Sequence, residues 1–333
     1  MSVAAELVVF IVAAAVSLST SWVLVSRLER VGQRLGLSEA LLGLLAALAA
    51  DAPEITSSVT ALAHGQRDVG AGVVIGSNVF NLAALLGLGA IVAGSIVLHR
   101  RVVLLAGSVA VWVAVVCVLA MTGAINAPWA LGLTGVAFIP YVVVLAAHRR
   151  GLGGLGLPRR WRTWLESAVE EEELEIDPAL DKHRGNLVDG LVAATALGIV
   201  LVASILMERS ATTVGLHYSV PGIIVGGIVL AAVTSLPNAV AAVYLSARGR
   251  GAATLSTALN SNSLNVIAGL LIPAVVLGLS KPSGASSFVG ASYLGLTVLV
   301  LVLAYAQRGL RRGAGWLIVG CYAAFVVTLF AVT

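Results

Sequence analysis

The chain has 333 residues, of which 59% are hydrophobic and 11% are charged. So low a charge excludes a disordered chain, and so much apolar sequence predicts a polytopic membrane protein. The net charge of +4 does not indicate a nucleic-acid partner, because the basic residues stand in short segments between apolar stretches. Cys117 and Cys321 lie inside apolar stretches, so we expect small buried side chains and neither a disulfide nor a CxxC metal motif.

Ten apolar stretches are long enough to cross a bilayer as helices. We therefore expect an all-α polytopic membrane protein with ten transmembrane helices. The first stretch has no basic residues ahead of it and carries Glu6, which favours a spanning helix over a cleaved signal peptide. Glycine, proline and polar side chains interrupt the second, third, seventh and eighth stretches. The predicted spans are residues 4–26, 37–63, 69–97, 102–122, 128–147, 186–206, 219–246, 252–279, 288–306 and 314–332.

The placement of Lys and Arg predicts the orientation of the chain, because cytoplasmic loops carry an excess of both. If both termini lie outside, seventeen of the twenty Lys and Arg residues fall on the cytoplasmic side. The outside then holds Arg67, Arg209 and Lys281. We expect an integral protein of the plasma (inner) membrane, surrounded by the lipid bilayer, with both termini outside.

The chain contains an internal duplication. Shifting it by 184 residues without a gap superimposes two glycines, a proline, a serine and two asparagines on identical residues, which chance rarely achieves. Each copy holds five predicted spans, and because five is odd, the second copy must be inverted in the membrane, as in alternating-access transporters. We expect a first repeat at 1–147, a cytoplasmic linker at 148–185 and a second repeat at 186–333. The matched pairs are Gly43 with Gly227, Pro53 with Pro237, Gly65 with Gly249, Ser77 with Ser261, Asn78 with Asn262, and Asn81 with Asn265.

The linker begins with a basic and aromatic stretch around Trp161 and Trp164 and continues into acidic residues at 170–173. We interpret it as a solvated connection between the repeats, with the two tryptophans at the membrane interface. A regulatory segment that senses cations or lipids is the alternative. The linker lacks the spaced Asp, Asn and Gly residues of a calcium loop.

Two carboxylates, Asp51 and Glu54, lie in the second predicted span on either side of Pro53. Residues three apart share a helix face, and an ionised side chain at the centre of a membrane costs about 2.5–3.5 kcal/mol. A bound cation would offset that cost. Because Pro53 has no N–H and clashes with the carbonyl four residues back, the carbonyl of Ala49 is a further candidate ligand. The alternative role for Asp51 is to cap the half-helix beyond the break.

Further polar residues stand at and beyond the two prolines. They are candidate cation ligands, and the alternative is that they hydrogen-bond neighbouring helices to one another. Carboxylate, amide and hydroxyl oxygens suit hard cations such as Ca²⁺ rather than a soft transition metal. The five histidines form no metal-ligand cluster, and no cofactor is expected. These candidates are Ser57, Ser58, Ser77, Asn78, Asn81, Thr234, Ser235, Ser261, Asn262 and Asn265.

These stretches resemble the two signature repeats of the cation/calcium exchanger superfamily, which includes the sodium/calcium exchangers. The resemblance covers about residues 43–91 and 227–275 and fits the ten-span layout. Pro53-Glu54 with Gly76-Ser77-Asn78-Val79-Phe80-Asn81 matches the first repeat, and Thr234-Ser235-Leu236-Pro237 with Asn260-Ser261-Asn262-Ser263-Leu264-Asn265 matches the second. The resemblance implies that Glu54 is a central cation ligand, surrounded by Ser77, Asn81 and the backbone carbonyls of Ala47 and Ala50, with Ala231 as the counterpart of Ala47.

Two positions depart from the family pattern. Asn238 stands where the family usually carries a second acid directly after the second proline, and Asp51 stands where it usually has a small hydroxyl residue. Both carboxylates therefore come from the first repeat. We hypothesise that Asp51 supplies the charge that Asn238 lacks.

The resemblance implies a secondary antiporter, not an enzyme, that exchanges a divalent cation for Na⁺ or H⁺ by alternating access, with Ca²⁺ as the expected substrate. Two like charges close together favour protonation of one, so protons are a natural counter-ion. Two alternatives stay open. One is a transport-inactive membrane sensor or scaffold derived from an exchanger. The other is an intramembrane enzyme that uses Asp51 and Glu54 as an acid/base pair, which the lack of a Gly-x-Gly-Asp-like motif and of a nucleophile–base pair disfavours.

Overall fold

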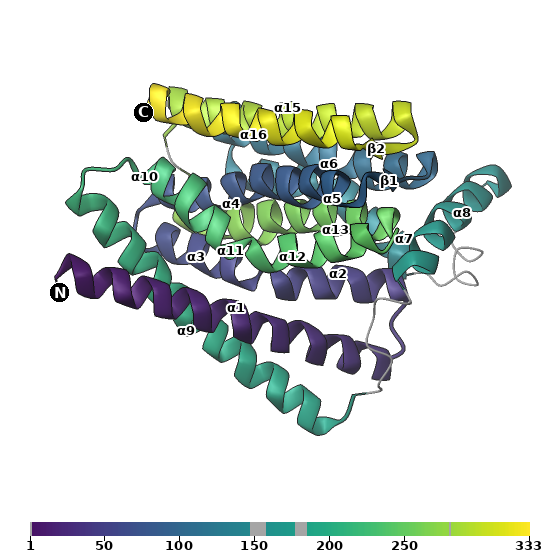
Figure 1. The fold of residues 1–333 in the computed structure, drawn as a ribbon, viewed down its shortest axis with the longest axis horizontal. Coiled ribbons are helices and arrows are strands. Elements are labelled where there is room, and N and C mark those ends of the chain that lie inside the picture. Colours follow the sequence, from purple (N-terminus) through teal and green to yellow (C-terminus); the bar gives the residue numbers. More distant parts are fainter. Residues whose placement is uncertain (1, 147–157, 177–184, 280) are drawn as a thin grey trace.

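The fold is described from a computed structural model, and the described residues are 2–146, 158–176, 185–279 and 281–333. Nearly all of them are helical, and the long helices run roughly side by side in one bundle (Figure 1). The N-terminus and the C-terminus lie at the same end of this bundle, and α8 (Arg159–Ile176) lies at the other end.

The first half of the chain contains one bent span and one long span that includes a π-helical segment. Helices α2 and α3 are bent by 49° at Asp51, and residues 67–93 form a continuous span through α4, η1 and α5. The elements are α1 (Val3–Arg34), α2 (Glu39–Ala50), α3 (Ala52–Ala63), α4 (Arg67–Asn81), the π-helix η1 (Leu82–Leu88), α5 (Gly89–Ala93), β1 (Ser95–Val97), α6 (Arg100–Met121) and α7 (Ala127–Ala146).

The second half repeats this plan. The run from α10 to α11 is bent by 49° against α12 at Ser235, and residues 251–277 form a continuous span. The elements are α9 (Leu187–His217), α10 (Gly222–Ile224), the π-helix η4 (Val225–Leu230), α11 (Ala231–Thr234), α12 (Leu236–Ala247), α13 (Gly251–Leu264), the π-helix η5 (Asn265–Leu271), α14 (Ile272–Leu277), α15 (Gly284–Gln307), β2 (Gly309–Arg311) and α16 (Arg312–Val332).

The expected all-helical polytopic fold is confirmed. Among the described residues eight helices are long and apolar enough to span a membrane, and the two bent pairs bring the number to ten if each counts as one span. Several predicted boundaries are wrong. Helix α1 continues to Arg34 and α9 to His217, so Arg27, Arg30 and Arg209 belong to helices rather than to loops.

Two short features were not predicted. Strands β1 and β2 pair antiparallel, Ile96 opposite Leu310, and join the turn before α6 to the turn before α16. Helix α8 lies inside the predicted linker and packs against α2, α6 and α13, with Ala168 and Val169 buried. The rest of the linker that was expected at 148–157 and 177–184 lies outside the described residues.

Proline sets the position of both bends. Pro53 and Pro237 each stand at the second residue of the half-helix beyond the bend. The N–H groups in the first turn of a helix have no intrahelical acceptor, so proline costs no hydrogen bond there. The hinge residues Asp51 and Ser235 have nearly identical backbone angles, with φ −80° and ψ −2° against φ −84° and ψ −1°. The duplication detected in the sequence is therefore also a duplication of backbone geometry.

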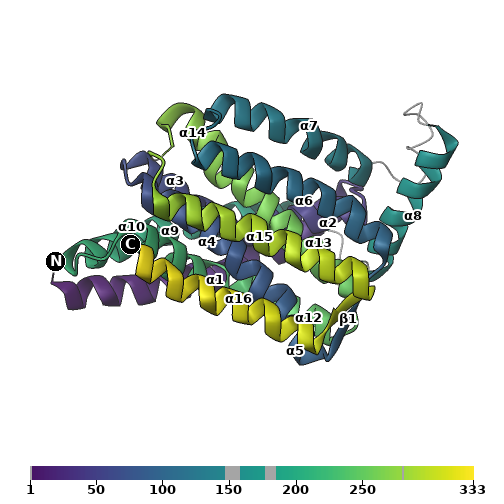
Figure 2. The same cartoon turned by 90° about the horizontal axis from the view of Figure 1, so that it is seen from above.

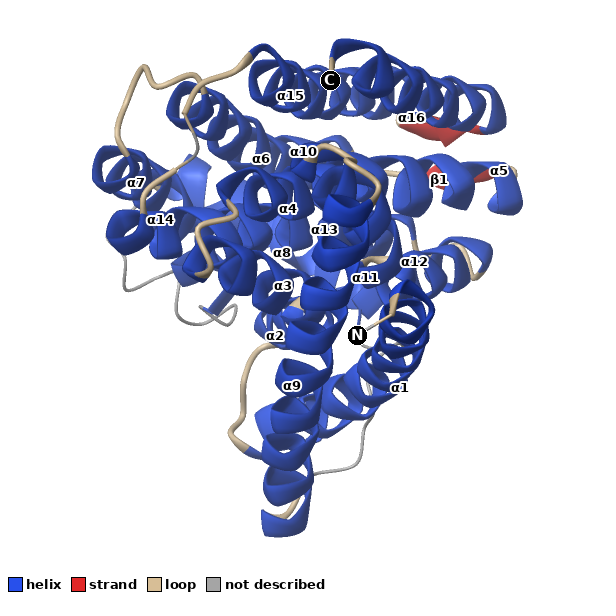
Figure 3. Ribbon diagram, turned by 90° about the vertical axis from the view of Figure 1, so that its left-hand side faces the viewer, coloured by secondary structure: helices blue, strands red, loops and turns tan. Residues whose placement is uncertain are grey.

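The two long polar spans lie at the centre of the bundle. Residues of α4 and η1 are buried almost without exception, whereas α1, α7, α9 and α16 leave much of their apolar surface exposed, as expected for helices that face lipid. Figure 2 shows α4 and α13 in the middle of the molecule, and Figure 1 shows α15 and α16 along one side of it. Figure 3 shows α1 and α9 together on the opposite side.

Glycine allows the central helices to touch. A Cβ added at Gly72 would lie 2.9 Å from the backbone nitrogen of Gly227, and one at Gly76 would overlap the backbone of the same residue. Helix α4 therefore crosses η4 at backbone contact, which small residues permit in membrane helices. This contact brings the polar turn that follows Gly76 against the bend of the other repeat.

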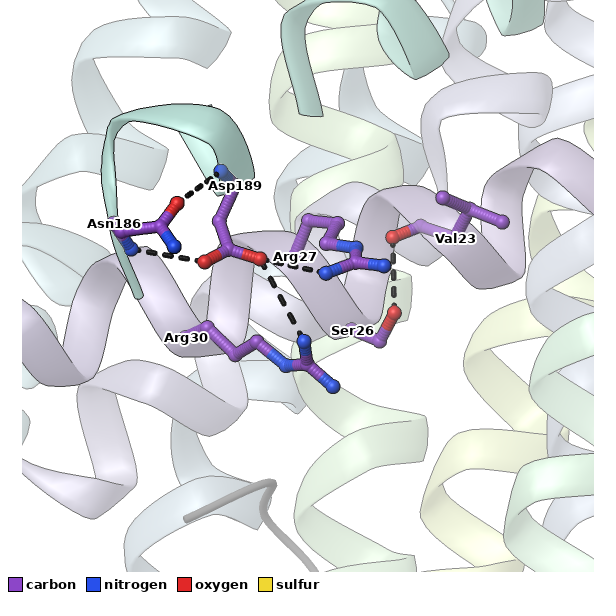
Figure 4. A network of polar contacts seen from close by, with 6 residues as sticks. All are labelled: Val23, Ser26, Arg27, Arg30, Asn186 and Asp189. Atoms are coloured by element: carbon purple, nitrogen blue, oxygen red, sulfur yellow. Dashed lines mark hydrogen bonds and ion pairs between the residues drawn. The ribbon is translucent and has the colours of Figure 1, made fainter. Parts of the chain in front are cut away.

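Charged side chains join α1 to α9 at the end of the bundle away from the termini. Asp189 accepts a hydrogen bond from the guanidinium of Arg27 at 2.7 Å and lies 3.6 Å from that of Arg30 (Figure 4). Asn186 and Asp189 also cap the start of α9 reciprocally. Ser17 and Ser204 are hydrogen-bonded further along the same pair of helices, at 3.0 Å.

This network predicts that the ion pairs of Asp189 contribute more to the thermal stability of the protein than the ion pair of Glu166. Asp189→Asn removes the charge that two arginines share across the repeats, so it should lower the Tm of the detergent-solubilised protein by several degrees. The matched control is Glu166→Gln, because Glu166 pairs with Arg162 only within α8, at 3.7 Å and half exposed, where such pairs contribute little. Thermal unfolding of both variants checks this, and equal Tm values for Asp189→Asn and the wild type would contradict it.

Candidate functional site

The polar residues predicted from the sequence meet where the two bends approach each other. Asp51 and Glu54 come from the α2–α3 bend, and Ser235 and Asn238 come from the α11–α12 bend. The remaining members lie on the two central spans. All ten side chains are at most 2% exposed, and those on the central spans are Ser77, Asn78, Asn81, Ser261, Asn262 and Asn265.

The two bends are hydrogen-bonded to each other through these side chains. Ser235 donates its hydroxyl to Glu54 Oε1 at 3.0 Å, and Asn238 donates its amide to Asp51 Oδ1 at 2.7 Å. Ser235 is the repeat counterpart of Asp51, and Asn238 is the counterpart of Glu54. The two bonds are therefore the same contact seen from either repeat. Asp51 and Asn238 are thus in direct contact, and that Asp51 supplies the charge that Asn238 lacks stays a hypothesis.

The asparagines repeat this symmetry on the central spans. Asn78 Nδ2 donates to the carbonyl of Asn262 at 3.0 Å, and Asn262 Nδ2 donates to the carbonyl of Asn78 at 3.1 Å. Asn81 Nδ2 donates to Asn262 Oδ1 at 3.1 Å, and Asn265 Nδ2 donates to Asn78 Oδ1 at 3.3 Å. Four amides thus fix the angle between the two repeats. Their amide nitrogens make the interhelical contacts that were considered as the alternative role, whereas Asn81 Oδ1 and Asn265 Oδ1 accept no hydrogen bond from any described residue.

Asp51 breaks the symmetry. Its Oδ1 also accepts the hydroxyl of Ser261 at 2.7 Å, and Ser261 in turn accepts an amide proton from Asn81 at 3.1 Å. The counterpart of Ser261 is Ser77, whose hydroxyl has no hydrogen-bond partner among the described residues. Asp51 occupies the N-cap position of α3, but its side chain makes no capping bond. The structure therefore does not support the alternative role of a helix cap.

Several buried oxygens of the site make no hydrogen bond with any described residue. Each would cost about 1–3 kcal/mol if it stayed without a partner, and no Lys, Arg or His side chain of the described residues forms an ion pair with either carboxylate. Two carboxylates, a hydroxyl and two amide oxygens make a donor set suited to a hard cation. These atoms are Asp51 Oδ2, Glu54 Oε2, Ser77 Oγ, Asn81 Oδ1 and Asn265 Oδ1.

The other expected ligands lie nearby but are already engaged. The carbonyl of Ala47 accepts the backbone N–H of Asp51 at 2.9 Å, which leaves it one lone pair. The carbonyl of Ala231 accepts both the backbone N–H of Ser235 at 3.2 Å and the hydroxyl of Thr234 at 3.4 Å. Thr234 donates to its own helix, to the carbonyl of Leu230 at 2.9 Å. Ala50 is the last residue of α2, and coordination by its carbonyl stays a prediction.

Three hydroxyl or carbonyl groups near the bend have distinct surroundings. Ser58 donates to the carbonyls of Gly70 and Gly269, so it joins helices. Ser57 is buried without a hydrogen-bond partner among the described residues. The carbonyl of Ala49, freed by Pro53, accepts the hydroxyl of Ser21 on α1 at 3.5 Å. Of these groups Ser57 alone retains the features of a candidate ligand.

Glu208 is a buried acid that was not among the predicted site residues. It is 1% exposed in the C-terminal part of α9, beyond residue 206, where the sixth predicted span ends. The sequence does carry a signal for a longer helix, because no proline or glycine stands between residues 199 and 214, and such residues are what usually end a helix.

The sequence as a whole matches one family model. The model described as sodium/calcium exchanger protein matches residues 5–147 and 190–331, most of both repeats but not the segment between them. Inner membrane protein YrbG of Escherichia coli is 25% identical over 283 residues, 84% of this chain and 82% of that protein. The protein named "Putative antiporter CaxA" of Alkalimonas amylolytica is 34% identical over 84 residues, only about a quarter of each chain.

Solved structures share the fold. The sodium-calcium exchanger NCX_Mj superposes with a TM-score of 0.64 at 18% identity, over 98% of this chain and 100% of that one. The H⁺/Ca²⁺ exchanger CAX gives a TM-score of 0.71 at 12% identity, over 98% and 87% of the respective chains. At these identities the likeness shows the fold alone, which is a polytopic one of inverted repeats.

Proposed function

We propose, from the fact that this chain belongs to the sodium/calcium exchanger protein family, that it is a secondary antiporter that exchanges Ca²⁺ for Na⁺ or H⁺. The family is one of exchangers, and this membership supports a transport function. The identities of its substrate and of its counter-ion are proposed from the chemistry of the site.

One observation carries the choice of a divalent cation. The five oxygens without partners belong to the α2–α3 bend and to the two central spans, and their formal charge is −2 when Asp51 and Glu54 are ionised. A divalent cation neutralises that charge with ligands of the kind that Ca²⁺ takes.

The same site suggests how exchange is coupled. When the divalent cation leaves, two carboxylates in a dry interior repel each other, and uptake of protons or of Na⁺ relieves the repulsion. NCX_Mj is a sodium-calcium exchanger and CAX is an H⁺/Ca²⁺ exchanger, so the fold serves both counter-ions. Because the site lies between inverted repeats, rocking of one repeat against the other would expose it to each side in turn.

The orientation follows from the distribution of Lys and Arg. We place both termini outside the plasma (inner) membrane and the segment at 148–185 in the cytoplasm, because seventeen of the twenty basic residues then lie on the cytoplasmic side. A reporter that is active only in the cytoplasm should stay silent when fused after Thr333 and should work when inserted in the segment at 148–157. An active C-terminal reporter would overturn this topology.

The function itself predicts the effect of one nearly isosteric change. Glu54→Gln keeps an oxygen that accepts from Ser235 but removes a charge that the cation needs. Ca²⁺ uptake into proteoliposomes, driven by an opposing Na⁺ or H⁺ gradient, should therefore fall at least 100-fold. The matched control is Ser263→Ala, because Ser263 is buried in the same motif but donates only to the carbonyl of Leu259 in its own helix. Exchange by Glu54→Gln at the wild-type rate would contradict the proposed function.

The contact between Asp51 and Asn238 predicts compensation between the repeats. Asp51→Ser leaves one carboxylate and should lose Ca²⁺ exchange, whereas Asn238→Glu places a third carboxylate against Asp51 and should slow ion release. The double variant restores two carboxylates, now one from each repeat, and should recover a measurable part of the exchange. Flux at several pH values, with and without a Na⁺ gradient, checks all three variants and identifies the counter-ion. A fully active Asp51→Ser variant would exclude the compensation.

A further inference from the structure

A fourth buried carboxylate has no role in the site described above. Among the described residues the buried carboxylates are Asp51, Glu54, Asp189 and Glu208, and Asp189 is paired with arginines. Glu208 accepts one hydrogen bond, from Thr212 on its own helix at 3.0 Å. It forms no ion pair with any described residue. A carboxylate kept inside a spanning helix without a countercharge in contact is costly and marks a functional position.

The position of Glu208 relates it to the cation site. Met207 and Ala211 of α9 pack in one cluster with Ala61 of α3, so Glu208 lies beside the outer half of α3. Ala61 stands two turns beyond Glu54 on the same helix face. Seven residues of helix rise by about 10 Å. Measured along the axis of α3, the level of Glu208 is therefore about 10 Å from Glu54. The C-terminal part of α9 runs toward the end of the bundle that carries both termini (Figure 1).

The interval between Glu54 and Glu208 contains a polar atom without a partner. Ser57 lies one turn beyond Glu54 on α3, is 0% exposed, and its hydroxyl makes no hydrogen bond with any described residue. Glu54 Oε2 is likewise buried and makes no hydrogen bond with any described residue. Polar atoms buried in this way need water or an ion to satisfy them. Ser57 Oγ and Glu54 Oε2 are polar atoms of the kind that line an ion path.

The basic groups near Glu208 are engaged elsewhere. The Arg209 guanidinium donates to Nε2 of His64 at 3.0 Å, and Nδ1 of His64 donates to the carbonyl of Thr60 at 2.7 Å. These two bonds assign the neutral tautomer with the proton on Nδ1. Glu6 of α1 accepts the hydroxyl of Ser210 at 2.9 Å. Both basic groups near Glu208 are therefore engaged, and the guanidinium of Arg209 is turned toward the end of α3.

We propose that Glu208 is the outer cation-attracting residue on a path between α3 and α9 that leads past Ser57 to Asp51 and Glu54. The inference rests on the proposed antiport function. A carboxylate with low-dielectric walls concentrates inorganic cations locally and speeds their entry. Glu208 is in this sense a positioning residue: it gathers the cation that the inner carboxylates then bind.

A chemical test follows the path without measuring transport. Ser57→Cys is introduced together with Cys117→Ala and Cys321→Ala, which removes the native thiols, and a membrane-impermeant cationic methanethiosulfonate is added from the outside. The thiol should react, and adding Glu208→Gln should slow that reaction roughly three- to tenfold without slowing an anionic methanethiosulfonate. Glu208→Asp should restore the cationic rate. An unreactive thiol, or equal slowing of both reagents, would overturn the path.

A flux measurement tests the same charge in the working transporter. With Ca²⁺ supplied from the outer side, Glu208→Gln should raise the apparent KM severalfold while the maximal rate stays within about twofold; with Ca²⁺ on the inner side the KM should not change. The control is Glu6→Gln, a carboxylate at the same end that is bonded to Ser210, which should match the wild type. Equal KM changes from both sides would indicate a merely structural role. A wild-type protein without flux would refute the proposed antiport function, whereas the thiol experiment would still decide the path.

Discussion

The main physical constraint on the structure is the free-energy cost of holding the carboxylates of Asp51 and Glu54 in a membrane interior. Each carboxylate is 0% exposed and keeps one oxygen without a partner among the described residues, and a charge at that depth is costly until a cation neutralises it. The surroundings lower the cost only in part, because Ser235, Asn238 and Ser261 donate to the other oxygens. The negative charge of the two carboxylates is therefore only partly compensated by the protein. A cation would neutralise the remainder, and under the proposed function it would bind there reversibly.

The rest of the bundle holds the two bends next to each other, so that residues of both repeats contact the two carboxylates. Proline fixes each bend at the same angle, glycine lets α4 touch η4, and the exchanged amide bonds between Asn78 and Asn262 set the relation of the repeats. Inversion of one repeat places equivalent groups on both sides of the site. Asn238 carries no charge, so both carboxylates of the candidate site, Asp51 and Glu54, come from the first repeat.

Much of the fold and of the candidate site could be predicted from the sequence, because membrane spans and a repeated motif are recognisable from short stretches of sequence. The bends at Pro53 and Pro237, the inverted halves and the pairing of Asp51 with Asn238 all follow from spacing. The length of α9 and the burial of Glu208 did not, since hydropathy falls where α9 continues past residue 206 and burial there comes from packing against α1 and α3. Helix α8 was missed because its charge pattern is typical of a solvated segment, and its two buried residues, Ala168 and Val169, give only a weak signal.

The most direct test of the central claim is to locate the cation. Crystals of the protein grown with Ca²⁺, measured where calcium scatters anomalously, should show one peak about 2.3–2.6 Å from both Asp51 Oδ2 and Glu54 Oε2, with Ser77, Asn81 or Asn265 completing the shell. The peak should disappear in crystals of Glu54→Gln. A peak elsewhere in the bundle, or none at saturating Ca²⁺ beside the unpaired oxygens, would contradict the account.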